Sequence, residues 1–115
     1  MSSSIVEGPA ILVGYAYRLQ IETEAPLFAE GCILHAHIRV KPSAAEILAE
    51  LSSQDGSLRR LSDHLLDLTI PPAATAVMPV GHVVLDMVRR DVTPALPLGF
   101  SLEIPVMLPV TRGLS

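Results

Sequence analysis

Aromatic residues are scarce in this chain, which has two Tyr, two Phe and no Trp among its 115 residues. Modules that bind carbohydrate depend on exposed aromatic rings, so this scarcity disfavours that class. The single cysteine, Cys32, excludes an intramolecular disulfide and therefore a disulfide-stapled scaffold. Cys32 precedes an apolar stretch without a Cys-His signature, so we interpret it as a small buried hydrophobe rather than a nucleophile.

Basic residues are also few. Eight Lys and Arg stand against twelve Asp and Glu, for a net charge of −4 and a pI near 5.4. Nucleic-acid-binding surfaces carry clustered Lys and Arg. The only adjacent basic pairs here are Arg59-Arg60 and Arg89-Arg90, which fit solvated loops or strand ends. We therefore expect no nucleic-acid partner.

Long hydrophobic runs are missing, although half of the residues are hydrophobic and the mean hydropathy is +0.47. No run approaches the roughly 18 apolar residues of a membrane-spanning helix, so we expect no membrane partner. The opening MSSSIVEGPA has no basic region followed by a long apolar one, which argues against a secretory signal. The aliphatic excess predicts strands covered on both faces, or apolar surface kept for a partner.

Two-residue alternation of apolar and polar side chains dominates the chain and predicts strands. In residues 32–41, Leu34, Ala36 and Ile38 point one way and His35 and His37 the other. The same period predicts strands over residues 11–22, 57–62, 65–70, 82–88 and 98–106. In the last of these, Pro105 and the following Pro109 indicate an edge position or a strand that finishes there.

Two segments between the predicted strands interrupt the alternation. Residues 44–51 (AAEILAEL) favour a helix by propensity, yet they lie between a strand and a Ser-Gln-Asp-Gly turn, so we predict a strand there. After residues 65–70, Pro71 and Pro72 end the strand, and the alanines that follow favour a short helical turn near residues 72–77. Pro79 and Gly81 then stop that turn.

About seven short strands with regular turn signals predict an all-β fold, an antiparallel β-sandwich with one short helical turn. The division we expect is a flexible N-terminal arm at residues 1–9, a sandwich domain at residues 10–110 and a C-terminal tail at residues 111–115.

His35 and His37 are the sharpest candidates for a chemical site, because residues i and i+2 of a strand share a face and both imidazoles could reach one metal ion. Such a site needs further ligands, which the spacing does not specify. The alternative is a solvent-facing strand whose outward positions happen to be histidines. The residues that could complete a site are His64, His82, Asp67 and Asp86.

Other catalytic patterns are missing from the sequence. There is no Gly-X-Ser-X-Gly elbow and no phosphate-binding glycine loop. Glu46 and Glu50 fall in the ambiguous segment, and alternation places Asp86 on the outward face, opposite Leu85 and Met87. The sequence therefore predicts no enzyme, no cofactor, and no assigned catalytic, cofactor-binding or metal-binding residue.

The order of these motifs resembles a family. The second strand "ILHAHIRVKPS", the hairpin "ILAELSSQDGSL", the segment "LDLTIPPAATAVMPVGHVVLDM" and the closing "GFSLEIPVMLPVTR" are similar to small immunoglobulin-like structural proteins of tailed phages and prophages. These in turn resemble the N-terminal domain of phage baseplate upper proteins. This chain has Val83 and Leu85 where aromatic residues are usual, and Leu12-Val13-Gly14 in place of a common Arg-Gly-Asp-like opening.

The resemblance implies an immunoglobulin-like sandwich without catalysis or cofactor. It implies a virion structural protein, assembled in the bacterial cytoplasm, that docks in many copies on other virion proteins in the tail or baseplate. Three alternatives stay open: a capsid-surface decoration protein of the same fold, a carbohydrate- or ligand-binding module, and a metal-dependent enzyme using His35 and His37.

Overall fold

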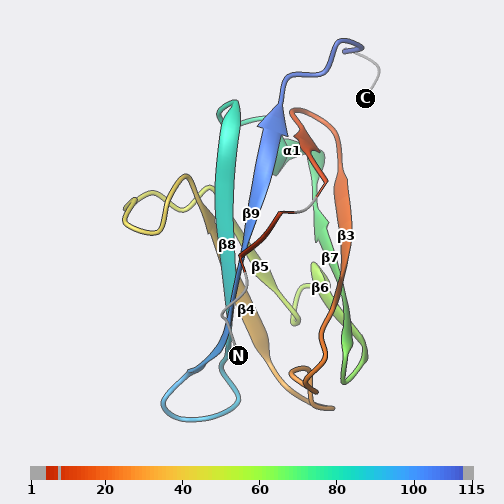
Figure 1. Cartoon of the computed structure of the whole chain (residues 1–115), viewed down its shortest axis with the longest axis vertical. Helices are drawn as coiled ribbons and strands as arrows, with labels where there is room; N and C mark the ends of the chain where they lie inside the picture. The colour runs from red at the N-terminus through yellow and green to blue at the C-terminus, as the bar shows by residue number, and fades with distance from the viewer. Residues whose placement is uncertain (1–4, 8, 113–115) are drawn as a thin grey trace.

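Two β-sheets pack face to face in the computed structural model, which describes residues 5–7 and 9–112 (Figure 1). The chain is therefore an all-β sandwich, as predicted. The elements in chain order are β1 (Ile5–Glu7), β2 (Ile11–Leu12), β3 (Tyr17–Glu22), β4 (Leu34–Arg39), β5 (Ala49–Ser52), β6 (Leu58–Ser62), β7 (Leu65–Ile70), α1 (Pro72–Thr75), β8 (Gly81–Arg89) and β9 (Leu96–Met107).

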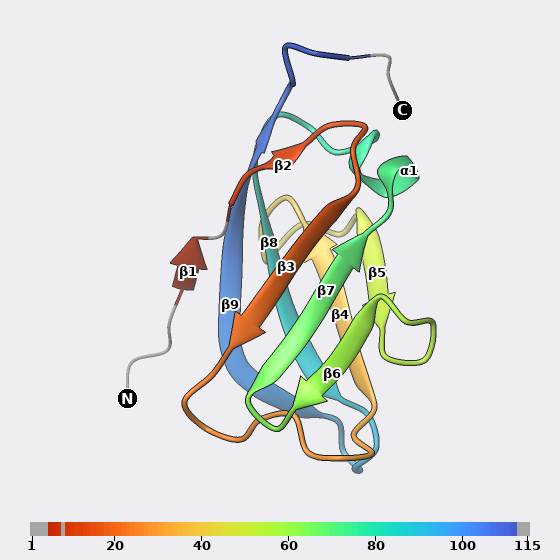
Figure 2. The same cartoon turned by 90° about the vertical axis from the view of Figure 1, so that its right-hand side faces the viewer.

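The strand order is that of an immunoglobulin-like fold. The smaller sheet runs β3-β7-β6 and the larger β1-β9-β8-β4-β5, with β2 also paired to β9 (Figures 1 and 2). Strands β3 to β9 pair antiparallel and divide between the sheets as immunoglobulin strands do, with β5 as an added edge strand. The short strands β1 and β2 were not predicted as separate strands, and both pair parallel with β9.

Aliphatic side chains fill the space between the sheets. Alternate residues of the central strands are buried, as the sequence pattern predicts. They are Leu34, Ala36 and Ile38 of β4; Leu66, Leu68 and Ile70 of β7; Val83, Leu85 and Met87 of β8; and Leu102, Ile104 and Val106 of β9. Antibody domains of this fold place a Trp against an inter-sheet disulfide, and this chain has neither, so its core depends on aliphatic packing.

The strand predicted over residues 11–22 is two strands in different sheets. Residues 11–12 form β2 against β9, and residues 17–22 form β3 in the smaller sheet. Between them, Gly14 has a φ of +88°, which an L side chain rarely adopts, and the chain turns from one sheet to the other. The alternation of Tyr17, Leu19 and Ile21 is confirmed, but the unbroken strand was wrong.

Residues 44–51 are only partly a strand. Strand β5 begins at Ala49 and continues to Ser52, while residues 44–48 have neither the predicted strand nor the helix favoured by propensity. The Arg39 guanidinium donates to the carbonyls of Ala44 (2.9 Å) and Ala45 (2.8 Å). These two carbonyl oxygens therefore bond to a side chain rather than to the backbone of a neighbouring strand. The strand prediction was therefore wrong for the first half of this segment.

The helical turn near residues 72–77 is confirmed as α1, which begins after the extended Pro71. Its last residue, Thr75, is fully buried. The Thr75 Oγ1 accepts the Gly14 N–H at 3.1 Å and lies 2.9 Å from the Tyr15 carbonyl oxygen and 3.1 Å from that of Pro72, to which it can donate. One hydroxyl thus links α1 by hydrogen bonds to the segment that connects β2 in one sheet to β3 in the other.

Of the two alternatives that Pro105 and Pro109 indicated, a strand that finishes there is confirmed, because β9 ends at Met107, and the edge position was wrong. Strand β9 pairs with β8 on one side and with β1 and β2 on the other. The two short strands pair with residues 101–103 and 106–107, so Pro105 lies in the gap between them, where its missing N–H interrupts no bond to either.

A tyrosine hydroxyl bonds to the backbone of the predicted arm, and a second one bonds to that of the predicted tail. Tyr17 Oη donates to the Pro9 carbonyl oxygen at 2.7 Å, and Tyr15 Oη donates to that of Thr111 at 2.6 Å. Within the arm, residues 5–7 form β1. Residues 1–4 and 8 of the arm and 113–115 of the tail lie outside the described residues.

Candidate functional site

The two histidines lie side by side on the outer face of the larger sheet. Both project outward from β4, opposite to the buried Leu34, Ala36 and Ile38. The side chains are half-buried, with 22% of His35 and 31% of His37 exposed. The ring centroids are 5.1 Å apart in an edge-to-face arrangement. The alternation of this strand is therefore confirmed by the structure.

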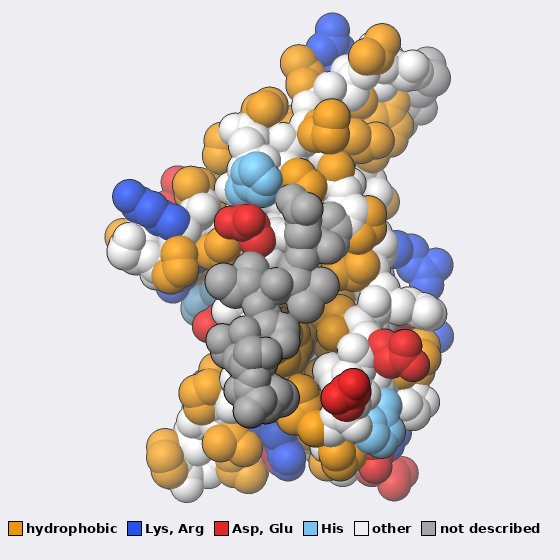
Figure 3. Space-filling model, viewed as in Figure 1, with side chains coloured by type: hydrophobic (Ala, Val, Ile, Leu, Met, Phe, Trp, Pro, Cys, Tyr) orange, Lys and Arg blue, Asp and Glu red, His pale blue; other side chains and the backbone are white. Residues whose placement is uncertain are grey.

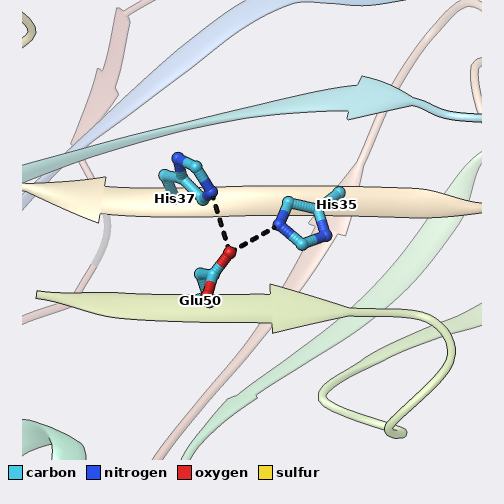
Figure 4. A group of neighbouring side chains, drawn as sticks. All are labelled: His35, His37 and Glu50. Carbon is cyan, nitrogen blue, oxygen red and sulfur yellow. Dashed lines mark hydrogen bonds and ion pairs between the residues drawn. The ribbon is translucent and has the colours of Figure 1, made fainter. Parts of the chain in front are cut away.

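Glu50 of the neighbouring strand completes a three-residue cluster (Figure 4). Strand β5 pairs antiparallel with β4 in a register that sets Glu50 opposite His37. Its Oε2 lies 3.0 Å from His35 Nε2 and 3.1 Å from His37 Nε2. Hydrogen bonds from His35 and then His37 hold the pKa of the Glu50 carboxyl below its ordinary value. One carboxylate oxygen thus faces two imidazole nitrogens.

Arg39, the next outward residue of β4, lies on the other side of His37. Its Nη2 is 3.3 Å from His37 Nδ1. A guanidinium only donates, so this contact makes Nδ1 the acceptor and leaves the proton of a neutral ring on Nε2, facing Glu50. The arginine and the carboxylate together orient the His37 ring.

None of the four additional ligands considered from the sequence joins this cluster. His64 follows β6 and its Nδ1 lies 3.0 Å from the Thr23 carbonyl oxygen, while Asp67 belongs to β7 in the other sheet. Asp86 of β8 is opposite His37 and is exposed, as predicted, but it lies outside the donor group, and so does His82.

Sequence reasoning missed Glu50. No local pattern in the sequence indicates it, because Glu50 faces His37 only through the β4–β5 register, across the loop of residues 40–48.

A shallow hollow of about 280 Å³ adjoins the cluster on the same face. His37 and Arg39 form one wall, and Asp86 of β8 and Ser101 of β9 lie across it. Its lining combines charged groups of both signs with the apolar Pro42, Val84 and Leu85, and the hollow leaves this side of the cluster open to solvent.

A buried carboxylate marks the opposite face of the sandwich. Asp67, on the central strand of the smaller sheet, is only 7% exposed. The Nη2 atoms of Arg18 and Arg59, from the strands on either side, lie 3.4 Å and 4.0 Å from its Oδ2. Both arginines are largely exposed and cover the carboxylate, so this group is a cross-strand ion pair with no open position for a substrate.

Cys32 packs partly against the core, and burial raises the pKa of its thiol. A raised pKa keeps a thiol protonated and weakly nucleophilic. Cys32 was predicted to be buried and is half-buried, with part of its side chain packed against the core.

One end of the sandwich exposes large apolar side chains. Around β2, the loop after α1 and the end of β9 lie Leu12, Val77, Val80, Met107, Leu108 and Val110, which we call the apolar end. Val77 and Val80 are 68% and 66% exposed, and Val110 is 98% exposed. Figure 3 shows hydrophobic side chains gathered over this end of the molecule, near the top of the view.

Comparison with known proteins adds no assignment: no protein-family model and no curated protein sequence matches the chain. Over the described ranges, 5–7 and 9–112, no helix has the length and apolar character needed to cross a membrane.

Proposed function

We propose that this protein is a non-enzymatic structural component of a tailed phage or phage-like particle, and that it docks on tail or baseplate proteins. The apolar end is the observation that carries the proposal. Single exposed apolar side chains are ordinary, but several large ones at the same end of a domain favour an interaction surface there.

Two further features support it. The sandwich is the fold that the resemblance to phage structural proteins implies, and such proteins act through their surfaces. All four aromatic side chains, which lie in the described part of the chain, are buried or half-buried. This arrangement offers no open aromatic platform and disfavours the carbohydrate-binding alternative.

The occupant we propose for the apolar end is another structural protein of the same particle. Val77 and Val80 lie in the loop before β8, and neither is needed to fill the core. Exchanging both for Asp would place two charges in a contact that otherwise excludes water, so we expect incorporation into particles to fall at least about tenfold.

The experiment is mass spectrometry of purified particles from cells that carry the gene, with wild type, the Val77→Asp/Val80→Asp variant and a Val92→Asp control. Val92 is also exposed but follows β8, at the opposite end of the molecule. Normal incorporation of the control beside loss of the double variant supports the proposal. Particles that lack the wild-type protein would overturn it. Electron microscopy of labelled particles distinguishes tail or baseplate from the capsid surface.

A further inference from the structure

We propose that His35, His37 and Glu50 form a binding site for a divalent transition-metal ion, with zinc as the ion that best fits the donors. The site is independent of the proposed docking function. Two imidazole nitrogens and one carboxylate oxygen are ligands typical of zinc, whereas calcium and magnesium prefer oxygen ligands alone.

The donor geometry is close to what an ion requires. Zinc–nitrogen and zinc–oxygen bonds of about 2.0–2.1 Å in a tetrahedral site place donor atoms roughly 3.3–3.4 Å apart. The Glu50 oxygen is 3.0 Å and 3.1 Å from the two Nε2 atoms, and all three donor atoms lie within 4.8 Å of one another. The Glu50 oxygen reaches these separations by a shift of a few tenths of an ångström, and the two rings must turn until their Nε2 atoms are also about 3.4 Å apart, with a fourth position open to water.

The backbone holds these side chains in place before any ion arrives. His35 and His37 share one face of β4, and the β4–β5 ladder continues through the pairs on both sides of Glu50. Half-burial of both rings limits their rotation. A preorganised site loses less entropy on binding than one assembled from mobile loops.

The Arg39 guanidinium disfavours a bound cation and so lowers the affinity of the site. Coordination by His37 Nε2 requires that nitrogen to be free of its proton, which in a neutral ring then resides on Nδ1. An Nδ1–H would face the Arg39 Nη2 atom at 3.3 Å, so the guanidinium must turn away when the ion binds. The bonds from its Nη1 to the Ala44 and Ala45 carbonyls restrain this rotation of the guanidinium. The restraint lowers the affinity of the site for the ion but does not abolish binding.

The test is zinc titration of the purified chain, followed by isothermal calorimetry and by the NMR signals of the histidine ring protons. We expect one saturable zinc per chain, with shifts at His35 and His37 that exceed those at His64 and His82. His35→Ala, His37→Ala and Glu50→Gln each weaken binding by about tenfold or more. Magnesium in place of zinc gives no comparable shift.

The matched control is His64→Ala, which removes an imidazole outside the cluster and leaves zinc affinity unchanged. All four substituted positions are on the surface or half-buried, and the amide NMR spectrum of each variant checks its fold. Arg39→Gln removes the opposing charge and should tighten binding several-fold. The proposal is overturned if zinc shifts no ring protons, if it shifts all four histidines alike, or if the cluster variants bind as the wild type does.

Discussion

Replacing Thr75 by Val would test whether a single buried hydroxyl holds the connection between the two sheets. Val has nearly the shape of Thr, so the substitution removes hydrogen bonds and leaves the packing almost unchanged. Two backbone groups lose a partner: the Gly14 N–H, 3.1 Å from Oγ1, and the Tyr15 carbonyl, 2.9 Å from it.

The magnitude follows from the burial of those groups. A buried donor or acceptor left without a partner costs about 1–3 kcal/mol. Gly14 and Tyr15 are half-buried, so the lower part of that range applies to each, for a total of about 2–3 kcal/mol. In a domain of this size each kcal/mol corresponds to about 4 °C in Tm, so we expect Thr75→Val to melt roughly 8–12 °C lower.

Thr75→Ser is the matched control, because it keeps the hydroxyl and removes one methyl group. Its cost should be about 1 kcal/mol. Urea unfolding monitored by circular dichroism gives both free energies. With an m-value of about 1.5 kcal/mol/M, the Val variant lowers the urea midpoint by roughly 1.3–2 M. If the Val variant is as stable as the Ser variant, the hydroxyl is not what holds α1 in place.

The remaining predictions concern the core and acid stability. Leu68→Ala, at a fully buried position of β7, should lower the free energy of unfolding by about 3 kcal/mol, whereas Leu61→Ala at an exposed position should cost less than about 0.5 kcal/mol; equal losses in urea unfolding would contradict the packing described. The side-chain bonds from Arg89, together with the Ile33 N–H, hold the pKa of the Asp91 carboxyl well below its usual 3.8. Its contribution to stability is thus complete above pH 3.8 and is lost as the pH falls toward the lower folded pKa. The Tm of the wild type should fall more steeply below pH 4 than the Tm of Asp91→Asn. An equal fall of Tm in the two proteins would refute this.

Alternation along the strands was enough to predict the sandwich, because burial of one face of a strand imposes a period of two whatever the details of packing. It predicted the outward direction of His35 and His37 as well as the inward aliphatic residues. The alternation of residues 11–22 hid a change of sheet, because a strand that passes from one sheet to the other keeps the same period on both sides of the turn at Gly14.

The site was harder to predict, since its third member depends on register. Nothing local in AAEILAEL indicates that Glu50 meets two histidines thirteen and fifteen residues earlier. Strand β5 begins only at Ala49, after a loop that Arg39 holds through its backbone carbonyls. These bonds come from a side chain outside residues 44–51, so the helix propensity of that segment does not reveal them.

The parallel pairing of β1 and β2 with β9 has a consequence for how the protein is made. Ile5 pairs with Ser101 and Ile11 with Val106, so the partners lie 96 and 95 residues apart in the sequence. A ribosome must synthesise the chain through Glu103 before β1 can pair fully, and through Met107 before β2 can. Until then the segment that precedes β3 lacks its pairing partner, and this edge of the larger sheet stays incomplete. We therefore place closure of this edge after β9 has left the ribosome, as a late step in folding.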